Sequence, residues 1–227
     1  MTAISSMFDA IAARYDGMNR VLSAGRDEVW RRKAARLLPR LGDNGRVLDL
    51  CGGTGDLCRA LRRQGVQACC VIGDFSWPML ALARPKRLQA HLAVMDALRL
   101  PLRDASFDAV ICGFGMRNLE SLEKGVGEIH RLLKPGGSFL TLDFFRPTTP
   151  FTRFFYRVFA PAFILLAGWL LGTRRDAYAY LTRSVLGFRS VEEYAALCLE
   201  GGFEKVAVAP CDFGIAHAVS AVKRSRA

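Results

Sequence analysis

The 227-residue chain is long enough for one domain with a buried core, and its 51% hydrophobic and 23% charged residues exclude a disordered chain. Its formal net charge of +11 favours anionic partners, and charge alone does not choose among nucleic acid, anionic lipid and acidic ligands. The charge is unevenly spread, because residues 46–143 have 13 basic and 10 acidic side chains, whereas 144–189 have seven arginines against the single acid Asp176.

The N-terminus lacks the basic start and apolar run of a signal peptide, so a cytoplasmic protein is expected. The seven cysteines form no CxxC pair, and several lie in apolar runs, which is typical of buried reduced thiols. The three histidines show no ligand spacing, and we expect no metal site.

Residues 1–40 are predicted to form an N-terminal helical cap, because Ile4, Phe8, Ile11 and Tyr15 recur at helical spacing. From Arg46 onward, short apolar runs alternate with amphipathic stretches. Such alternation predicts a mostly parallel sheet covered by helices on both faces. The expected strands are 47–50, 68–72, 92–95, 107–112 and 138–143, and the expected helices are 56–64, 77–84 and 121–133.

Residues 144–189 break this alternation and are predicted to form a late helical insertion, rich in apolar and basic residues. Its apolar run, 159–171, has 13 residues, short of the ~20 that span a bilayer, and Pro161 disturbs a regular helix. The last part, 190–227, begins with a helix at 190–200, where Ser190 and Glu193 suit a capping box, and ends in strands 205–209 and 216–222. The whole chain is thus expected to form one doubly wound, Rossmann-like α/β domain with a seven-stranded sheet and a cofactor-binding core at 46–143.

The most informative motif is a glycine-dense turn, Gly52-Gly53-Thr54-Gly55, which follows a buried strand and opens a helix. Glycine there permits positive φ angles and lets a ligand approach the backbone closely. A dinucleotide fingerprint needs a further glycine at position 58, but Cys58 stands there. The acid Asp49 at the strand end suits a cationic amino-acid ligand better than a pyrophosphate, so the turn favours S-adenosylmethionine.

Two more acidic residues follow neighbouring predicted strands. Asp74 lies 25 residues after Asp49, where its carboxylate is able to accept hydrogen bonds from both ribose hydroxyls. Asp96 and Ala97 follow the third strand, where a carboxylate and an amide suit the adenine edge. The alternatives are that Asp74 caps the next helix and that Asp96 lies in an ordinary loop. The order and spacing of all these acids favour the cofactor site.

The chain resembles the ubiquinone/menaquinone biosynthesis C-methyltransferases from Phe8 to Lys223. The resemblance rests on five blocks: Tyr15–Asn19, Asp49–Asp56, Phe114–Asn118, Leu133–Gly137 and Asp176–Leu181. It implies a class I methyltransferase fold and C-methylation of a prenylated benzoquinol or naphthoquinol. It also implies a cofactor-binding set made of Asp49, Gly53, Thr54, Gly55, Asp74, Phe75, Asp96, Ala97 and Gly113. Four residues depart from the family pattern: Cys51 for a usual alanine, Gly113 for serine, Asp143 for glutamate and Arg189 for proline.

Methyl transfer to a ring carbon needs alignment and an electron-rich ring, so we expect a group that favours the phenolate form of the substrate. Arg117 and Asn118 follow the fourth strand and are the candidates to face the donor methyl, since a guanidinium beside a phenol lowers the pKa of the phenol. Tyr15, Asp16, Asp176 and Tyr178 are the candidates to pass the proton to water. The alternatives are that Arg117 pairs with Glu120 on the surface and that Tyr178 only packs in the insertion.

The sequence leaves three alternative functions open. A nucleic-acid methyltransferase explains the charge, but the chain lacks an Asn-Pro-Pro-Tyr type of signature and an added RNA-binding module. A phospholipid or other lipid methyltransferase shares the cofactor motifs and is the main alternative, ahead of a non-enzymatic binding module.

The apolar run with its flanking arginines predicts peripheral contact with the inner face of the membrane. Packing of that run inside the domain or at a homodimer contact is the alternative.

Overall fold

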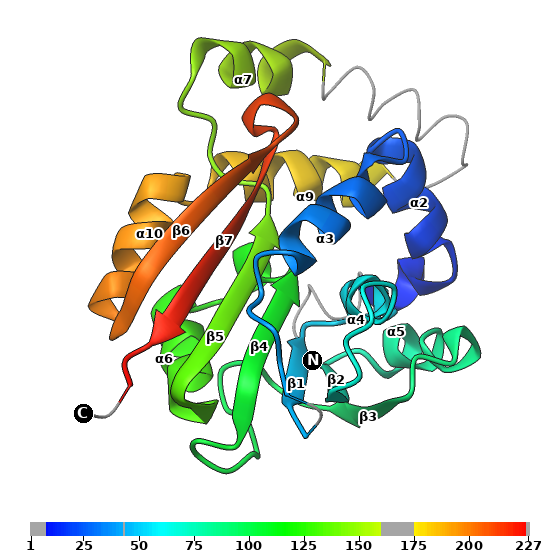
Figure 1. Ribbon diagram of the computed structural model, residues 1–227. Coiled ribbons are helices and arrows are strands. Elements are labelled where there is room, and N and C mark those ends of the chain that lie inside the picture. The colour runs from blue at the N-terminus through cyan, green and yellow to red at the C-terminus, as the bar shows by residue number, and fades with distance from the viewer. Residues whose placement is uncertain (1–7, 43, 160–174, 226–227) are drawn as a thin grey trace.

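The computed structural model describes residues 8–42, 44–159 and 175–225, and a single seven-stranded sheet forms its centre (Figure 1). The strand order is β3-β2-β1-β4-β5-β7-β6. All pairs are parallel except β5–β7 and β6–β7, which are antiparallel. The strands are β1 (Arg46–Leu50), β2 (Cys69–Asp74), β3 (Ala90–Val94), β4 (Phe107–Gly113), β5 (Leu133–Asp143), β6 (Phe203–Cys211) and β7 (Ala216–Lys223).

The sequence predicted this doubly wound sheet and all seven strands, with errors at some strand ends. The largest error is at β5, which begins at Leu133 and not at Ser138. Leu133 pairs with Phe107 of β4, and the register then shifts before Ala109 pairs with Ser138. The Pro135-Gly136-Gly137 segment between them carries turn residues, which hid the first part of the strand.

Helices cover both faces of the sheet and form two separate cores. One core combines the sheet with α3 (Arg26–Ala35), α4 (Asp56–Arg62) and α5 (Trp77–Ala81). The other combines it with α6 (Leu122–Leu132) and α10 (Val191–Glu200), the latter opened by the expected Ser190–Glu193 capping box. The strands that lie between these layers, β1 and β4, are almost entirely buried, which is why most of their residues are apolar.

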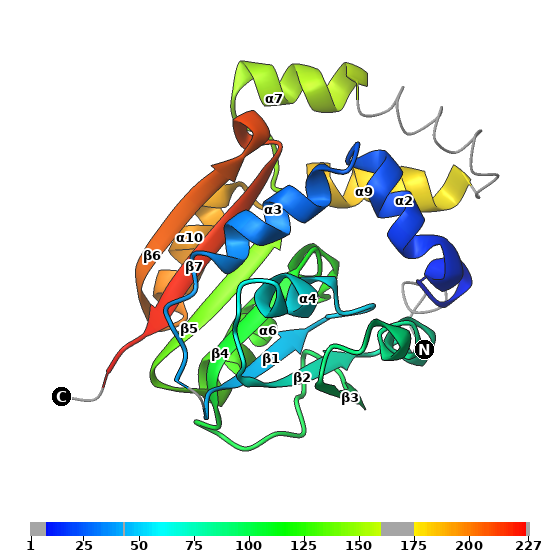
Figure 2. The ribbon, with the colours of Figure 1, turned by 45° about the vertical axis from the view of Figure 1, so that its right-hand side comes forward.

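The N-terminal cap and the late insertion meet above the edge of the sheet where β4 and β5 end (Figures 1 and 2). The cap contains η1 (Ala12–Arg14) and α2 (Tyr15–Leu22), followed by α3. The insertion contains α7 (Pro150–Phe154), a π-helical turn η4 (Phe155–Phe159) and α9 (Arg175–Leu186). Most of the apolar run at 159–171, including Pro161, lies outside the described residues. None of the described helices is long and apolar enough to cross a membrane.

Three short 3-10 helices complete the connections. These are η2 (Arg84–Lys86), η3 (Met116–Asn118) and η5 (Asp212–Gly214). Two of them matter for the site: η3 follows β4 and carries Arg117 and Asn118, and η5 forms the turn between β6 and β7. Figure 1 shows that this β6–β7 turn lies beside α7 of the insertion.

Candidate active site

The glycine-dense turn between β1 and α4 has the backbone conformation that its sequence predicts. Gly53 and Gly55 have φ angles of 52° and 76°. A Cβ atom on Gly55 would lie 2.5 Å from Cδ1 of Leu88, so only glycine fits there. Cys51 also has a positive φ, 52°, which is uncommon for a residue other than glycine. The turn therefore presents an open, closely approachable backbone.

Asp49 lies beneath this turn and is fully buried. Its Oδ2 accepts a hydrogen bond from the Cys58 N–H at 3.0 Å, and its Oδ1 has no partner within the described part of the chain. Burial raises the pKa of Asp49 to about 7. A buried carboxylate oxygen without a partner suits a cationic ligand group, so Asp49 fits the amino-acid end of S-adenosylmethionine.

Asp74 ends β2 on the other side of the turn. Its Oδ2 accepts from the Gly53 N–H at 2.9 Å, and its Oδ1 accepts from the Ser76 N–H at 2.9 Å. Burial raises the pKa of Asp74, although these backbone hydrogen bonds oppose the shift. Ser76, and not Asp74, caps α5 through Met79. Asp74 therefore joins the glycine turn to β2 and leaves further acceptor capacity for a ligand.

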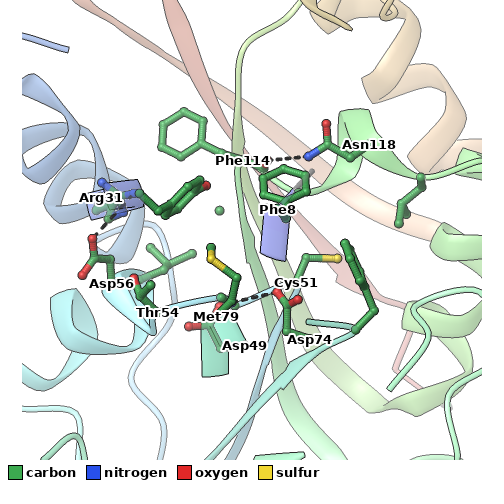
Figure 3. A pocket seen from close by; sticks show the side chains of 18 residues that line it. Phe8, Arg31, Asp49, Cys51, Thr54, Asp56, Asp74, Met79, Phe114 and Asn118 are labelled. Carbon is green, nitrogen blue, oxygen red and sulfur yellow. Dashed lines mark hydrogen bonds and ion pairs between the residues drawn. The ribbon is translucent and has the colours of Figure 1, made fainter. Parts of the chain in front are cut away.

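A cavity of about 60 Å³ collects most of the predicted cofactor residues, and we call it the donor pocket (Figure 3). Its walls include Asp49, Gly53, Thr54, Asp74, Phe75 and Gly113. Gly55, Asp96 and Ala97 do not line it; Asp96 is exposed and accepts a hydrogen bond from Leu98 at 2.9 Å.

A hydrogen bond connects the N-terminal cap to the glycine turn, and an ion pair connects it to Lys86. Asp16 of α2 accepts a hydrogen bond from the Thr54 hydroxyl at 2.6 Å and pairs with Lys86 at 2.6 Å. Lys86 also contacts Asp56 of α4 at 2.7 Å. Asp16 thus connects cap and core, and it lines neither the donor pocket nor the second cavity described below.

Arg31 of α3 is a donor-pocket residue that the sequence did not reveal. Its side chain is buried, pairs with Asp27 at 2.5 Å, and lies over the Phe114 ring at 5.2 Å from the ring centre. The Asp27–Arg31 spacing was visible, but such i,i+4 pairs normally lie on solvated helix faces. Arg31 thus places a positive charge on the wall of the pocket that Asp49 also lines.

Arg117 of η3 is buried and does not pair with Glu120 on the surface, so that alternative is wrong. Its Nη1 donates to Asp143 Oδ1 at 2.5 Å and to the Phe114 carbonyl at 2.8 Å. Burial is the largest single effect and lowers the pKa of Arg117, but the charge and hydrogen bond of Asp143, together with Tyr15 and Tyr180, outweigh it and the net pKa is raised. Burial raises the pKa of Asp143, and Arg117 opposes this shift. The guanidinium is thus a permanently charged group in a fixed orientation.

Asn118 is held on both sides by hydrogen bonds. Its Nδ2 donates to the Phe114 carbonyl at 3.2 Å, which Figure 3 shows as a dashed line. Its Oδ1 accepts from the Tyr180 hydroxyl at 2.9 Å. Tyr180 was not among the predicted site residues. Asp176 and Tyr178 were predicted site residues. Both belong to α9, but their side chains lie outside the described residues.

A second and larger cavity of about 390 Å³ adjoins the donor pocket, and we call it the acceptor cavity. Both cavities share Phe8, Tyr15 and Phe114 in their walls. Most of its lining is aromatic or aliphatic and comes from the cap, η3, the end of β5, the insertion and the β6–β7 turn. Arg117 lies on this wall. The arrangement suits a largely apolar molecule whose polar end lies at the junction of the two cavities.

Comparison with known proteins agrees with this geometry. Residues 1–223 match the model of the ubiE/COQ5 methyltransferase family. The chain is 41% identical to a demethylmenaquinone methyltransferase of Thermus thermophilus, over 87% of this chain and 91% of the relative. It is 39% identical to the ubiquinone/menaquinone biosynthesis C-methyltransferase UbiE of Geobacter sulfurreducens, over 94% of this chain and 85% of the relative.

Solved structures support the fold at lower identity. A possible histamine N-methyltransferase of Thermotoga maritima, described as SAM-dependent, has a TM-score of 0.69 and 18% identity, covering 97% of this chain and 99% of that chain. A chain from the complex between the Trm112 methyltransferase activator of Haloferax volcanii and a putative methyltransferase has a TM-score of 0.68 and 21% identity. The match covers 96% of this chain and 97% of that chain. The chain belongs to the ubiE/COQ5 methyltransferase family and is an S-adenosylmethionine-dependent methyltransferase of class I fold.

Proposed function

We propose that the chain methylates a ring carbon of a prenylated quinol, converting demethylmenaquinol to menaquinol or carrying out the equivalent step of ubiquinone synthesis. The names of the relatives support this substrate class. The observation that carries the proposal is the acceptor cavity, a large and mostly apolar space that adjoins the donor pocket at Tyr15 and Phe114. An aromatic ring with a hydrocarbon tail matches such a lining.

The residues of the donor pocket bind and orient the methyl donor. S-adenosylmethionine, when bound, supplies an electrophilic methyl group on a positively charged sulfur. Asp49 and Arg31 provide opposite charges for its amino-acid end, and Asp74 provides acceptors for its ribose hydroxyls. Thr54 lies on the same wall. Fixed positioning of two reactants accounts for a large part of the rate of such a displacement.

Arg117 is the group that activates the ring. Its guanidinium lies on the acceptor cavity, where a positive charge favours the phenolate form of a ring hydroxyl and thereby raises electron density on the neighbouring carbon. Asp143 holds the guanidinium in place through Nη1. Within the described part of the chain, the hydrogen bonds of Arg117 use its backbone N–H and Nη1, so Nη2 remains available to a ligand.

The proton of the ring hydroxyl leaves through neighbouring polar groups. Tyr15 lies on both cavities, and burial raises its pKa, so it acts as a neutral hydrogen-bonding group and not as a phenolate base. Asp16 lies one residue further on, bonded to Thr54 and half exposed. Asp176 and Tyr178 of α9 stay in the proposed path as sequence predictions.

A phospholipid acceptor is less well supported. The amine of an ethanolamine headgroup gains affinity from carboxylates or from the faces of aromatic rings, and a nearby guanidinium repels it. Arg117 lines the acceptor cavity, and the two carboxylates on its wall, Asp27 and Asp212, are already paired with Arg31 and Arg26. Anaerobic methyl transfer from labelled donor to a demethylnaphthoquinol, a benzoquinol precursor and phosphatidylethanolamine tests the proposal. Label in phospholipid alone would contradict it.

We also propose that the protein contacts the inner face of the membrane, where a prenylated substrate resides. Large apolar side chains of α7 and η4 are exposed, among them Phe151, Phe154 and Phe159. Arg153 and Arg157, also exposed, lie between them. Apolar groups that enter the lipid interface and arginines that meet anionic headgroups together produce peripheral binding.

Sedimentation with liposomes tests this contact. We expect wild type to bind anionic vesicles, less well at high salt, and to bind neutral vesicles weakly. Replacing Phe154 and Phe159 by serine lowers binding, whereas replacing Val94, exposed on β3, by serine does not. Equal sedimentation of all three proteins would contradict the docking surface. Gel filtration in parallel detects a homodimer, which is the alternative use of such an apolar face.

A further inference from the structure

The hydroxyl of Tyr180 has a fixed direction that follows from its neighbours. The Phe114 carbonyl only accepts hydrogen bonds, so the side chain of Asn118 must turn its Nδ2 toward it, at 3.2 Å. The amide oxygen of Asn118 then faces Tyr180, at 2.9 Å from the hydroxyl. An amide oxygen only accepts, so the Tyr180 O–H donates to it. The phenolic oxygen of Tyr180 is left with lone pairs only.

Tyr180 and Arg117 are connected through Asn118: Arg117 Nη1 and Asn118 Nδ2 donate to the same Phe114 carbonyl, and the Tyr180 hydroxyl donates to Asn118 Oδ1. Both residues line the acceptor cavity, and the charge of Arg117 lowers the pKa of Tyr180 against the stronger, opposite effect of burial. Arg117 has hydrogen-bond donors and no acceptor. The wall therefore offers a ligand oxygen one donor, Arg117, and one acceptor, Tyr180.

On the basis of the proposed function, we propose that Tyr180 selects the reduced quinol over the oxidised quinone. In the bound complex before the ring is deprotonated, a ring hydroxyl donates to Tyr180 and accepts from Arg117, so one oxygen satisfies both groups. A quinone carbonyl accepts from Arg117 but donates nothing, and it leaves the Tyr180 oxygen facing a second acceptor. A site built to bond a hydroxyl discriminates strongly against a ligand that lacks it.

Selection of the quinol matters for the reaction, because only the reduced ring is electron-rich enough to attack the methyl group of the donor. A quinone bound in the cavity would occupy the site without reacting. Tyr180 is thus a specificity residue that keeps the unreactive redox form of the same molecule out of the site. The neighbouring Tyr178 was the sequence prediction; Tyr180 is the residue that contacts Asn118.

Equilibrium dialysis with a short-chain naphthoquinone and its dithionite-reduced naphthoquinol, both under anaerobic conditions and without donor, measures the preference. We expect wild type to bind the quinol at least about tenfold more tightly, which corresponds to 1.4 kcal/mol. Tyr180→Phe removes the acceptor and brings the two affinities close together. Tyr156→Phe is the matched control on the same cavity, since its hydroxyl bonds the Ile215 carbonyl at 2.7 Å, and it keeps the preference.

Asn118→Leu tests the same idea with Tyr180 in place. Without the amide oxygen, the Tyr180 hydroxyl is free to donate to a carbonyl, so quinone affinity rises. Calorimetry with the donor product S-adenosylhomocysteine confirms that each variant is folded. A preference that survives in Tyr180→Phe, or that is lost equally in Tyr156→Phe, overturns the role of Tyr180. Failure of wild type to bind either ring form overturns the proposed quinol substrate as well.

Discussion

The donor pocket and the acceptor cavity are neighbours, but they are built in different ways. The donor pocket is formed mainly by strand ends and turns between Asp49 and Asn118, and backbone N–H groups fix its key carboxylates. The walls of the acceptor cavity come from the cap, η3, the insertion and the β6–β7 turn, and they consist mainly of side chains. Substitutions at the acceptor cavity should therefore change which molecule is methylated and how fast, and leave donor binding intact.

The largest effect expected is at Arg117, which lines the acceptor cavity and donates a hydrogen bond to the carbonyl of Phe114, a residue on the walls of both cavities. Arg117→Ala removes the charge that favours the phenolate, and loss of one such stabilising group typically lowers turnover by about 10²–10³-fold. Donor affinity should change little, because Arg117 does not line the donor pocket. Steady-state kinetics and calorimetry measure the two quantities separately. Normal turnover in a folded variant would mean that the Arg117–Asp143 pair is only structural.

A pH-dependent effect is expected at Asp49 of the donor region. Its pKa is raised to about 7 in the folded chain, so the native state binds a proton more tightly than the unfolded state does. The stability contributed by this proton is present below the unfolded pKa and is lost as the pH rises to about 7. Without donor, the contribution of Asp49 to the free energy of unfolding should fall by roughly 1 kcal/mol per pH unit in that window.

Asp49→Asn should remove this decline. Denaturant unfolding at several pH values between 4.5 and 7.5 compares the two proteins, with Asp104→Asn, an exposed carboxylate, as control. If wild type and Asp49→Asn lose stability equally with rising pH, Asp49 does not titrate in this range.

A smaller effect, on donor affinity, is expected at Asp74, which also lines the donor pocket. Asp74→Ala removes acceptors for the ribose hydroxyls and the hydrogen bond to Gly53, and should weaken donor binding by about tenfold, or 1.4 kcal/mol. Turnover at saturating donor should change less. Calorimetry gives the affinity, and an unchanged value in a folded variant would remove Asp74 from the donor site.

The residues that the sequence predicted for the donor site mostly come together in one pocket, whereas those predicted for the acceptor side do so only in part, for a physical reason. Asp49, Gly53 and Asp74 lie at the ends of adjacent parallel strands, and such ends meet at one edge of a sheet whatever the details of packing. Tyr180 and Tyr178 are two residues apart on α9, and which of them faces the cavity depends on how the helix packs against η3. Periodicity alone does not fix that rotation.

Two further residues show the same limit. Asp143 stood out in the sequence only as a departure from the family pattern, and its pairing with Arg117 arises because β5 ends beside η3. In the sequence, Arg31 resembles an ordinary charge on a helix surface. In the structure, α3 brings its side chain to the pocket beside the glycine turn. Contacts between distant segments decide both roles, and no local pattern carries that information.

The central claim is that the acceptor cavity receives the ring that is methylated. Thr182→Trp fills this cavity from α9, and Arg183→Trp, at an exposed position on the same helix, is the matched control. Methyl transfer to a short-chain demethylnaphthoquinol should fall by at least about tenfold in Thr182→Trp and remain near wild type in Arg183→Trp, with donor affinity unchanged in both. Equal activity of the two variants would mean that the quinol binds elsewhere.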